Sequence, residues 1–238
     1  MIGIVGGVGP LAGAHLYRRL VELTGATTDE EHPSVVLVSL PVPSRIAHLL
    51  DGGESPLPAL ERALEMLADL GCTVAALASA TTHAYRDLLL ERTALELVDG
   101  IAAACADLAS SSPALGVVFC TSAARRYELY ERAWPEGVEL AYPNERDQRT
   151  LDGLIAGVKN GAAPPRLARE LRALVERYAG DGTACLLGCT ELPLVWSPTF
   201  GSEGIVSISD SIARAALAAA GPPSSQPSRL VTARETSR

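Results

Sequence analysis

Short apolar runs alternate with longer amphipathic segments along the chain as far as residue 220. The short runs indicate buried strands, and the longer segments carry apolar residues at helical spacing. Strands and helices in alternation are typical of an α/β fold with parallel sheets. The predicted strands are residues 1–6, 35–40, 74–78, 95–99, 116–120, 138–141, 183–187 and 205–208, and the predicted helices are residues 11–23, 56–70, 83–92, 100–109, 125–134, 147–158, 164–178 and 210–220.

Two of the predicted strands end in the same way. The run 183–187 leads into Cys189, and the run 74–78 leads into Ser79, each with small or hydroxyl-bearing residues around it. The strands that open the two halves of the chain also resemble each other. Such internal similarity predicts two related α/β halves, with the loops at their strand ends facing each other across a cleft.

We therefore predict two pseudo-symmetric, three-layer α/β domains with mostly parallel sheets and the active site in the cleft between them. Residues 1–112 would form the first domain and residues 113–208 the second. Residues 209–220, an alanine-rich helix, are expected to pack back on the first domain. Residues 221–238 are rich in Pro, Ser and Arg, which indicates a flexible tail without a role in the chemistry.

Composition narrows the function classes. The chain has 238 residues, of which 47% are hydrophobic, so it can bury a substantial core. A net charge of −8 argues against a nucleic-acid partner. The five cysteines have neither metal-ligand spacing nor a disulfide pattern, which favours a reducing, cytoplasmic location. No stretch has the length and apolarity of a membrane helix, and no basic segment of a signal peptide opens the chain.

The Cys189 stretch carries the most informative chemistry. Thr190 and Glu191 have the character of a first helical turn, which would place the thiol between a strand end and a helix N-terminus. That position lowers a thiol pKa and favours the reactive thiolate. The alternative is a buried structural cysteine, and this stretch alone leaves both interpretations open. The other four cysteines lie in or beside apolar stretches and are expected to be buried and structural.

A glycine-rich turn, residues 6–10, joins the first predicted strand to the first predicted helix. A strand, a glycine loop and a helix in succession predict an anion site at the helix N-terminus. A dinucleotide-binding fold is the alternative. No acidic residue follows strand 35–40, and the glycine spacing departs from the dinucleotide fingerprint, so this alternative is disfavoured.

Three other residues have both a functional and a structural interpretation. Arg45 follows a strand and two prolines, where it would serve as a carboxylate clamp or remain a solvated surface group. His83 would act as an acid–base group or orient the Ser79 loop, and the supporting role is favoured. Lys159 lies just before a glycine at a predicted helix end, where a cation also has a purely structural explanation.

Taken together, these motifs resemble the aspartate/glutamate racemase superfamily, and within it the aspartate racemase branch. The resemblance runs from Met1 to about Ala220. The segments that carry it are the glycine loop 6–11, Pro43-Ser44-Arg45, Asp147-Gln148, Lys159 with Gly161, and Gly188-Cys189-Thr190-Glu191-Leu192.

This resemblance implies a homodimeric isomerase that uses neither pyridoxal phosphate nor any other cofactor, nor a metal. Its partner would be a small substrate that bears a carboxylate, and it would bind neither nucleic acid nor membrane. Two cysteines of the family, one from each half, face opposite sides of the substrate α-carbon. One thiolate removes the α-proton, and the other thiol delivers a proton to the far face.

The resemblance also implies roles for individual residues. Arg45 and Lys159 would hold the distal carboxylate of an acidic amino acid. Cys189 and Ser79 occupy the two catalytic positions, and the residues that follow them would hold the α-carboxylate. The remaining substrate-binding positions are Gly7, Ala80, Thr81, Thr121 and Thr190, and the supporting positions are His83 and Glu191.

The chain departs from the family at the first catalytic motif. The family has Cys-Asn-Thr-x-His, whereas this chain has Ser79-Ala80-Thr81-Thr82-His83. The first thiol is therefore a hydroxyl, and the amide that would bind the α-carboxylate is replaced by a methyl group. A second family threonine, near Ala124, is also absent. A hydroxyl is a much weaker acid than a thiol, whose usual pKa is about 8.5, so Ser79 would be a poor base near neutral pH.

Three hypotheses follow from this departure. In the first, the protein is a slow or one-sided racemase of aspartate, glutamate or a close relative. In the second, it is a cofactor-independent decarboxylase, lyase or isomerase that needs only one cysteine and an anion hole. In the third, it is a binding homologue that keeps the cleft without the reaction. The loss of polar groups at Ala80 and Ala124 also predicts a wider pocket for a bulkier acid.

Overall fold

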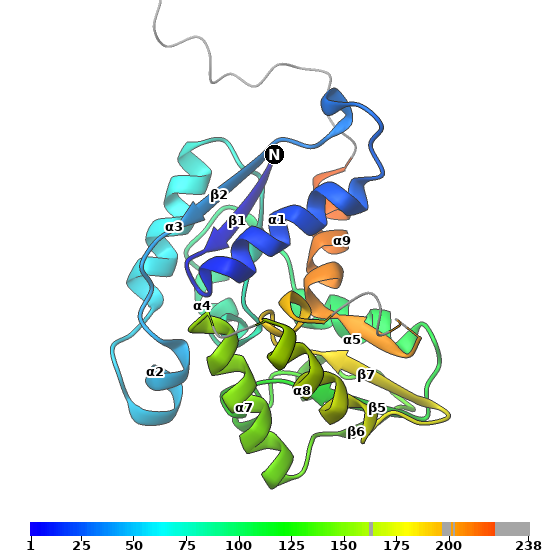
Figure 1. Cartoon of the computed structure of the whole chain (residues 1–238). Coiled ribbons are helices and arrows are strands. Elements are labelled where there is room, and N and C mark those ends of the chain that lie inside the picture. Colours follow the sequence, from blue (N-terminus) through cyan, green and yellow to red (C-terminus); the bar gives the residue numbers. More distant parts are fainter. Residues whose placement is uncertain (162–163, 197–200, 202, 222–238) are drawn as a thin grey trace, which may run out of the picture.

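Two parallel sheets of four strands each form the core of the protein (Figure 1). The computed structural model describes residues 1–161, 164–196, 201 and 203–221, so the predicted tail lies outside the described residues, apart from Gly221. The strands are β1 Ile2–Gly6, β2 Val35–Ser39, β3 Val74–Leu77, β4 Glu96–Leu97, β5 Leu115–Phe119, β6 Glu139–Ala141, β7 Thr183–Leu187 and β8 Ile205–Ser207.

Both sheets have the same strand order. The first is ordered β2-β1-β3-β4 and the second β6-β5-β7-β8, and all pairings are parallel. In each half the first strand in sequence is central and buried, because a strand covered by helices on both faces is apolar throughout. Ser79 comes two residues after the end of β3, and Cys189 comes two residues after the end of β7. The predicted pseudo-symmetric α/β fold is confirmed.

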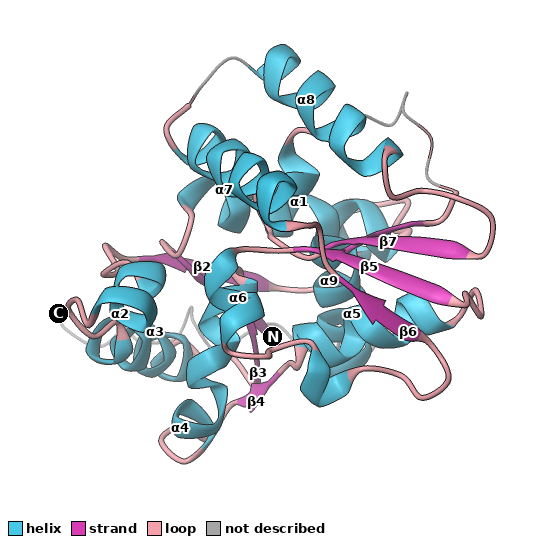
Figure 2. Cartoon of the chain, turned by 90° about the horizontal axis from the view of Figure 1, so that it is seen from below, coloured by secondary structure: helices cyan, strands magenta, loops and turns pink. Residues whose placement is uncertain are grey.

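Helices cover both faces of each sheet. Figure 2 shows α7 and α8 on one side of the β5–β7 sheet and α5 on the other. The helices are α1 Pro10–Thr24, α2 Arg45–Asp51, α3 Leu57–Asp69, α4 Arg86–Leu90, α5 Gly100–Ala109, α6 Ser122–Arg126, α7 Glu145–Lys159, α8 Pro164–Glu176 and α9 Ile208–Ala220.

The last helix, α9, follows β8 directly and packs against α1 and α5. Two ion pairs fix this packing. Asp210 of α9 receives Arg19 of α1 at 2.7 Å, and Arg214 of α9 reaches Asp107 of α5 at the same distance. Helix α9 therefore connects the second sheet to α1 and α5, which follow strands of the first half. The domain boundary between residues 112 and 113 stays a prediction.

The prediction of a helix over residues 125–134 is wrong. Helix α6 begins earlier because the Thr121 hydroxyl accepts a hydrogen bond from the amide of Ala124. It ends early because Glu128 takes a left-handed conformation, with φ at 51°. The chain then turns inward and buries Tyr130 completely. Burial of this aromatic side chain takes precedence over the local helical spacing.

Two other local predictions also need correction. Arg45 is not a loop residue but the first residue of α2, because the Ser44 hydroxyl caps this helix by accepting from the amide of Ala47 at 3.2 Å. The predicted helix 83–92 is split into a 3₁₀ helix, Ala80–Tyr85, and α4. The tighter 3₁₀ turn begins directly after Ser79 and therefore shapes the loop that carries it.

All five cysteines are free thiols and buried, as predicted for the four in apolar stretches. Within the described part of the chain, no helix has the length and apolarity that a membrane span requires. The described residues also contain no group of three or more His, Cys, Asp or Glu side chains arranged to hold a metal ion.

Candidate active site

The loops that follow β3 and β7 meet where the two halves of the molecule join. The Thr190 hydroxyl donates a hydrogen bond to the carbonyl oxygen of Ala78 at 3.2 Å. The hydroxyls of Thr81 and Thr121 share a second hydrogen bond, also of 3.2 Å. Because Ala78 precedes Ser79 and Thr190 follows Cys189, the first of these bonds brings the two predicted acid–base residues to the same junction.

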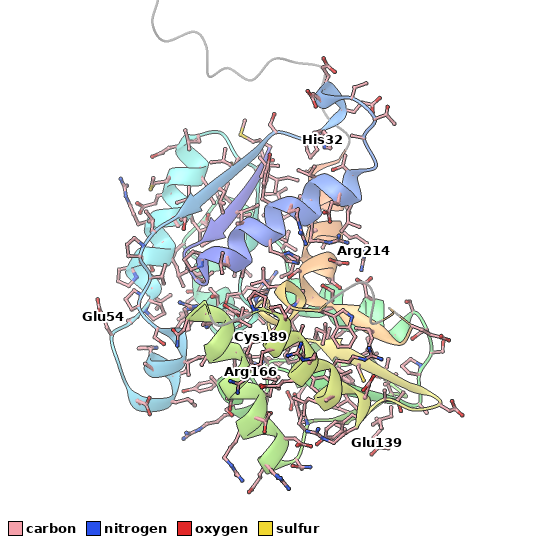
Figure 3. The ribbon with its side chains drawn as sticks, in the orientation of Figure 1. His32, Glu54, Glu139, Arg166, Cys189 and Arg214 are labelled. Carbon is pink, nitrogen blue, oxygen red and sulfur yellow. The ribbon has the colours of Figure 1, made fainter. Side chains whose placement is uncertain are left out.

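Cys189 lies near the centre of the molecule (Figure 3). Its side chain is 5% exposed, and its thiol donates to the Oε2 atom of Glu191 at 3.0 Å. Burial raises the pKa of the Cys189 thiol well above its usual value, and the neighbouring Glu191 carboxylate raises it further, against the opposing charge of Lys159. The resting form of Cys189 is therefore the protonated thiol.

The predicted lowering of the Cys189 pKa by a helix N-terminus is wrong. No α-helix begins after Cys189, because the chain makes only a short 3₁₀ turn, Leu192–Leu194. A single turn has almost no helix dipole. The same turn places Glu191, two residues further on, in contact with the thiol, and a carboxylate beside a thiol opposes its ionisation.

Ser79 has an extended backbone and is 6% exposed. Its carbonyl accepts a hydrogen bond from the Nδ1 atom of His83 at 3.2 Å, and the Nε2 atom of His83 accepts from the amide of Gly100 at 3.0 Å. These partners define the neutral tautomer with its proton on Nδ1, and burial lowers the pKa of His83 further. His83 thus links the Ser79 carbonyl to the amide of Gly100, and both of its nitrogens are engaged. Its supporting role stays a prediction.

A pocket of about 260 Å³ lies next to Cys189, which is itself not one of the lining residues. Glu191 connects the two, since its carboxylate contacts the Cys189 thiol and also lines the pocket. The start of α1 contributes another wall, so the helix N-terminus predicted to favour anions faces this space. The lining residues are Val8, Gly9, Pro10, Leu11, Ala12, Val42, Ser44, Arg45, Val158, Lys159, Glu191 and Leu194.

Two cations stand on the walls of the pocket. Arg45 is 8% exposed and donates to the carbonyl oxygen of Val8, while its Nε atom is buried without a partner among the described residues. Burial lowers the pKa of Arg45, but a guanidinium stays protonated in proteins. The Nζ atom of Lys159 lies 3.7 Å from Oε1 of Glu191. Both cations therefore line the pocket together with the Glu191 carboxylate, and their predicted role in substrate binding stays a prediction.

Close packing of the glycine loop explains two of its glycines. Gly7 has φ at +72°, and a Cβ atom there would lie 1.8 Å from the carbonyl oxygen of Leu40. Gly9 has φ at +142°, and a Cβ atom would lie 2.4 Å from Oε1 of Glu191. Gly7 thus shapes the turn against the next strand, whereas Gly9 lets the loop approach the Glu191 carboxylate and line the pocket.

The sequence of this chain matches a known family. Residues 5–222 match the model of the Asp/Glu/Hydantoin racemase family. The chain belongs to this family.

Solved structures agree in fold. Aspartate racemase from Picrophilus torridus is similar over 93% of this chain and 94% of its own, with 23% identity and a TM-score of 0.79. An aspartate racemase homologue from Pyrococcus horikoshii covers 92% and 98%, with 20% identity and a TM-score of 0.69. Glutamate racemase from Francisella tularensis, in complex with D-glutamate, covers 90% and 78%, with 17% identity and a TM-score of 0.58. The prediction of an isomerase of this racemase family is confirmed.

The prediction of a wider pocket at Ala80 and Ala124 is wrong, because neither residue lines the pocket next to Cys189. Ala80 is 3% exposed and Ala124 is 1% exposed, and both belong to the hydrophobic core cluster. Ser79, Thr81, Thr121 and Thr190 are likewise buried and do not line that pocket.

Tyr130 is a site residue that sequence reasoning missed. It is fully buried, and its hydroxyl donates to the carbonyl oxygen of Gly188, the residue before Cys189. A Cβ atom at Gly188 would lie 2.6 Å from this hydroxyl, so glycine is required there. Burial raises the pKa of Tyr130, which keeps it a donor. No local pattern links residues 58 positions apart, so the sequence offers no signal for this contact.

Lys159 does carry a sequence signal of its own. It is the only lysine of the chain, since the other members of the 20 basic residues are all arginine. A chain that uses arginine everywhere else uses lysine only beside Glu191, at the wall of the pocket. The two cations differ in chemistry, because lysine is a compact point charge and arginine a planar fork.

Proposed function

We propose that this protein is a cofactor-independent isomerase that exchanges the α-proton of an acidic amino acid mainly on one face, through Cys189. Ser79 would serve the opposite face slowly, as a hydroxyl in place of a thiol. The observation that carries this proposal is the 3.0 Å hydrogen bond from the Cys189 thiol to Glu191, at the junction of the two strand-end loops. It pairs a buried thiol with a group that accepts its proton.

The proton steps follow from this pairing. The Cys189 thiol gives its proton to Oε2 of Glu191, and the resulting thiolate removes the α-proton of the substrate. The electron pair of the broken C–H bond stays on the substrate as an enolate. Return of the proton from the Cys189 thiol restores the starting enantiomer, whereas delivery from the Ser79 hydroxyl inverts it. After inversion, solvent water returns a proton to the Ser79 oxygen, and the Glu191 carboxyl loses its extra proton to solvent. Because a hydroxyl is a weak acid, inversion is the slower outcome.

The walls of the pocket support an acidic substrate. Arg45, Lys159 and the N-terminus of α1 surround one space, where a carboxylate gains from each of them. The buried, unpartnered Nε atom of Arg45 would be satisfied by such a ligand. One structure of similar fold, the glutamate racemase from F. tularensis, is a complex with D-glutamate. Aspartate, glutamate or a close relative is therefore the substrate class we propose.

Proton NMR of L- and D-aspartate and of L- and D-glutamate in deuterated buffer tests this function. The α-proton signal of one enantiomer should decline in the presence of the protein, because Cys189 serves one face of the α-carbon. The buffer without protein gives the background rate. Retention of all four α-proton signals would contradict the proposed function.

A second candidate function is a single-cysteine decarboxylase, lyase or isomerase of a carboxylic acid. The replacement of the first thiol by Ser79 favours it, because such a reaction needs one proton donor. Such a reaction also needs donors to an enediolate. The hydroxyls of Thr81, Thr121 and Thr190 bond within the junction in this structure, so they would have to give up these bonds to serve as donors. Turnover of a substituted malonate or of maleate, without exchange of amino-acid α-protons, would favour this alternative. Ligand binding without turnover would indicate a binding homologue.

Replacing Glu191 with glutamine is expected to lower the pKa of the Cys189 thiol. The Glu191 charge holds this pKa up, and Lys159 would then act on the thiol unopposed. The rate of Cys189 alkylation by iodoacetamide, followed by mass spectrometry against pH, should reach its half-maximum at a lower pH in Glu191→Gln. An unchanged pH profile would show that Glu191 does not control the thiol.

Replacing Lys159 with methionine is expected to raise KM for the amino-acid substrate by about 10- to 100-fold, with a smaller effect on kcat, because a charge-assisted contact to the substrate is lost. Steady-state exchange kinetics measure both constants. Lys159→Arg should recover part of the loss, since it keeps the charge. Equal KM values in the wild type and in Lys159→Met would remove Lys159 from the binding site.

A further inference from the structure

A second hollow, of about 350 Å³, lies on the second half of the molecule, away from the pocket next to Cys189. It is formed between α6 and the first turns of α7. Three arginines and one glutamate line it, so it is locally positive in a chain with a net charge of −8. The lining residues are Ser122, Arg125, Arg126, Glu145, Gln148 and Arg149.

The three arginines of this arginine hollow are not consumed by internal ion pairs. Arg125 donates to the carbonyl oxygen of Pro143 at 3.0 Å, and its guanidinium lies 5.1 Å from the centre of the Tyr142 ring. These contacts hold the guanidinium in place, and Arg125 forms no ion pair with another described residue. Arg126 and Arg149 make no hydrogen bond or ion pair with any residue in the described ranges. Planar guanidinium groups with free donors are suited to phosphate and carboxylate groups.

Two acids stand at the hollow, Glu145 on its wall and Asp152 next to it. The Asp152 carboxylate accepts hydrogen bonds from the amide and hydroxyl of Ser122 and from the side-chain amide of Gln148. Glu145 lies in the first turn of α7, where a carboxylate is stabilised by the helix dipole. It forms no ion pair with the arginines within the part of the chain that the structure describes. It therefore offsets one of the three positive charges without closing the hollow.

Gln148 forms the inner wall of the hollow. It is 6% exposed, and its side-chain amide donates to the carbonyl oxygen of Cys120 at 2.9 Å. Its Oε1 atom is buried and has no partner among the described residues. A buried acceptor without a partner is uncommon in folded proteins, and a ligand with an O–H or N–H group would satisfy it.

We propose that the arginine hollow binds a small anion with two or more negative charges, either a phosphate ester or a di- or tricarboxylate. The site is separate from the proposed racemase site and does not depend on it. The two remain neighbours, however, because Ser122 directly follows Thr121, whose hydroxyl bonds Thr81 at the junction. A bound anion would therefore contact the loop that carries a residue of the catalytic junction.

Isothermal titration of the full chain at low salt, separately with inorganic pyrophosphate and with citrate, tests this site. We expect saturable binding of at least one of the two, and the one that binds identifies the phosphate or the carboxylate class. The double variant Arg126→Gln/Arg149→Gln should weaken it by about tenfold or more, because charge-assisted hydrogen bonds are removed. Saturation by neither probe would overturn the proposal.

The matched control is Arg166→Gln/Arg169→Gln on α8, which removes the same number of charges from outside the hollow. This control should bind the probe as tightly as the wild type. Equal weakening in both double variants would show general attraction to positive charge, and wild-type affinity in Arg126→Gln/Arg149→Gln would place the anion elsewhere. Either result would contradict the arginine hollow.

Discussion

Replacing Cys189 with alanine is expected to lower the rate of α-proton exchange by about 10³-fold or more, because the variant lacks the group that acts as acid and base. Cys189 is the thiol at the junction of the two loops, and in the proposed mechanism it becomes a thiolate by passing its proton along the hydrogen bond to Glu191. The Ser79 hydroxyl at the matching position cannot replace it near neutral pH. Proton NMR in deuterated buffer measures the exchange rate of both proteins under identical conditions.

Cys185→Ala provides the matched control for this experiment. Cys185 is a buried thiol on β7, the strand that leads to Cys189, and both thiols belong to the core cluster of the second half. The two differ in that the thiol of Cys189 donates to Glu191. Removal of the Cys185 thiol should cost some stability through loss of packing, on the order of 1–2 kcal/mol, and leave the exchange rate per folded molecule unchanged. Exchange that survives in Cys189→Ala, or that is lost equally in Cys185→Ala, would contradict the role of Cys189.

The Ser79→Cys variant is expected to invert its substrate about 10²- to 10⁴-fold faster than the wild type, the range that a positioned acid–base group contributes. Ser79 stands two residues after β3, as Cys189 stands two residues after β7, so a thiol there would face the opposite side of the α-carbon. The change adds no large volume to the loop. Chiral chromatography of the products over time measures the rate of inversion.

Two further variants separate the possible causes of a negative result. Ser79→Ala should abolish the residual inversion while leaving exchange on the Cys189 face intact. If Ser79→Cys does not gain activity, the double variant Ser79→Cys/Ala80→Asn restores the amide that the family has beside its first cysteine. Failure of both cysteine variants to invert the substrate faster would mean that Ser79 does not occupy the second acid–base position.

The fold could be predicted from the sequence because the pattern of apolar residues is periodic and recurs in both halves of the chain. Short buried strands and amphipathic helices alternate, and the runs before Ser79 and Cys189 have the same plan. Strand order and parallel pairing are then the expected solution for such a chain. The positions of Ser79 and Cys189 at strand ends are part of the same pattern, so the sequence alone places both in equivalent loops.

The environment of Cys189 depends on contacts that no local pattern contains. Its pKa direction was predicted wrongly because the type of one turn, Leu192–Leu194, decides whether a helix dipole or the Glu191 carboxylate acts on the thiol. The hydrogen bond from Thr190 to Ala78 joins residues 112 positions apart. Likewise, the inward turn of Tyr130 interrupts a segment with helical spacing, because burial of a large side chain outweighs helix propensity.

The most direct test of a one-thiol site compares exchange with inversion for the same molecule. Each enantiomer of aspartate and glutamate is incubated with the protein in deuterated buffer, and the loss of the α-proton and the appearance of the opposite enantiomer are followed together. We predict that one enantiomer exchanges its α-proton much faster than it inverts, because Cys189 removes and returns the proton on one face. Equal rates of exchange and inversion from both enantiomers would contradict this account, because they require two efficient acid–base groups.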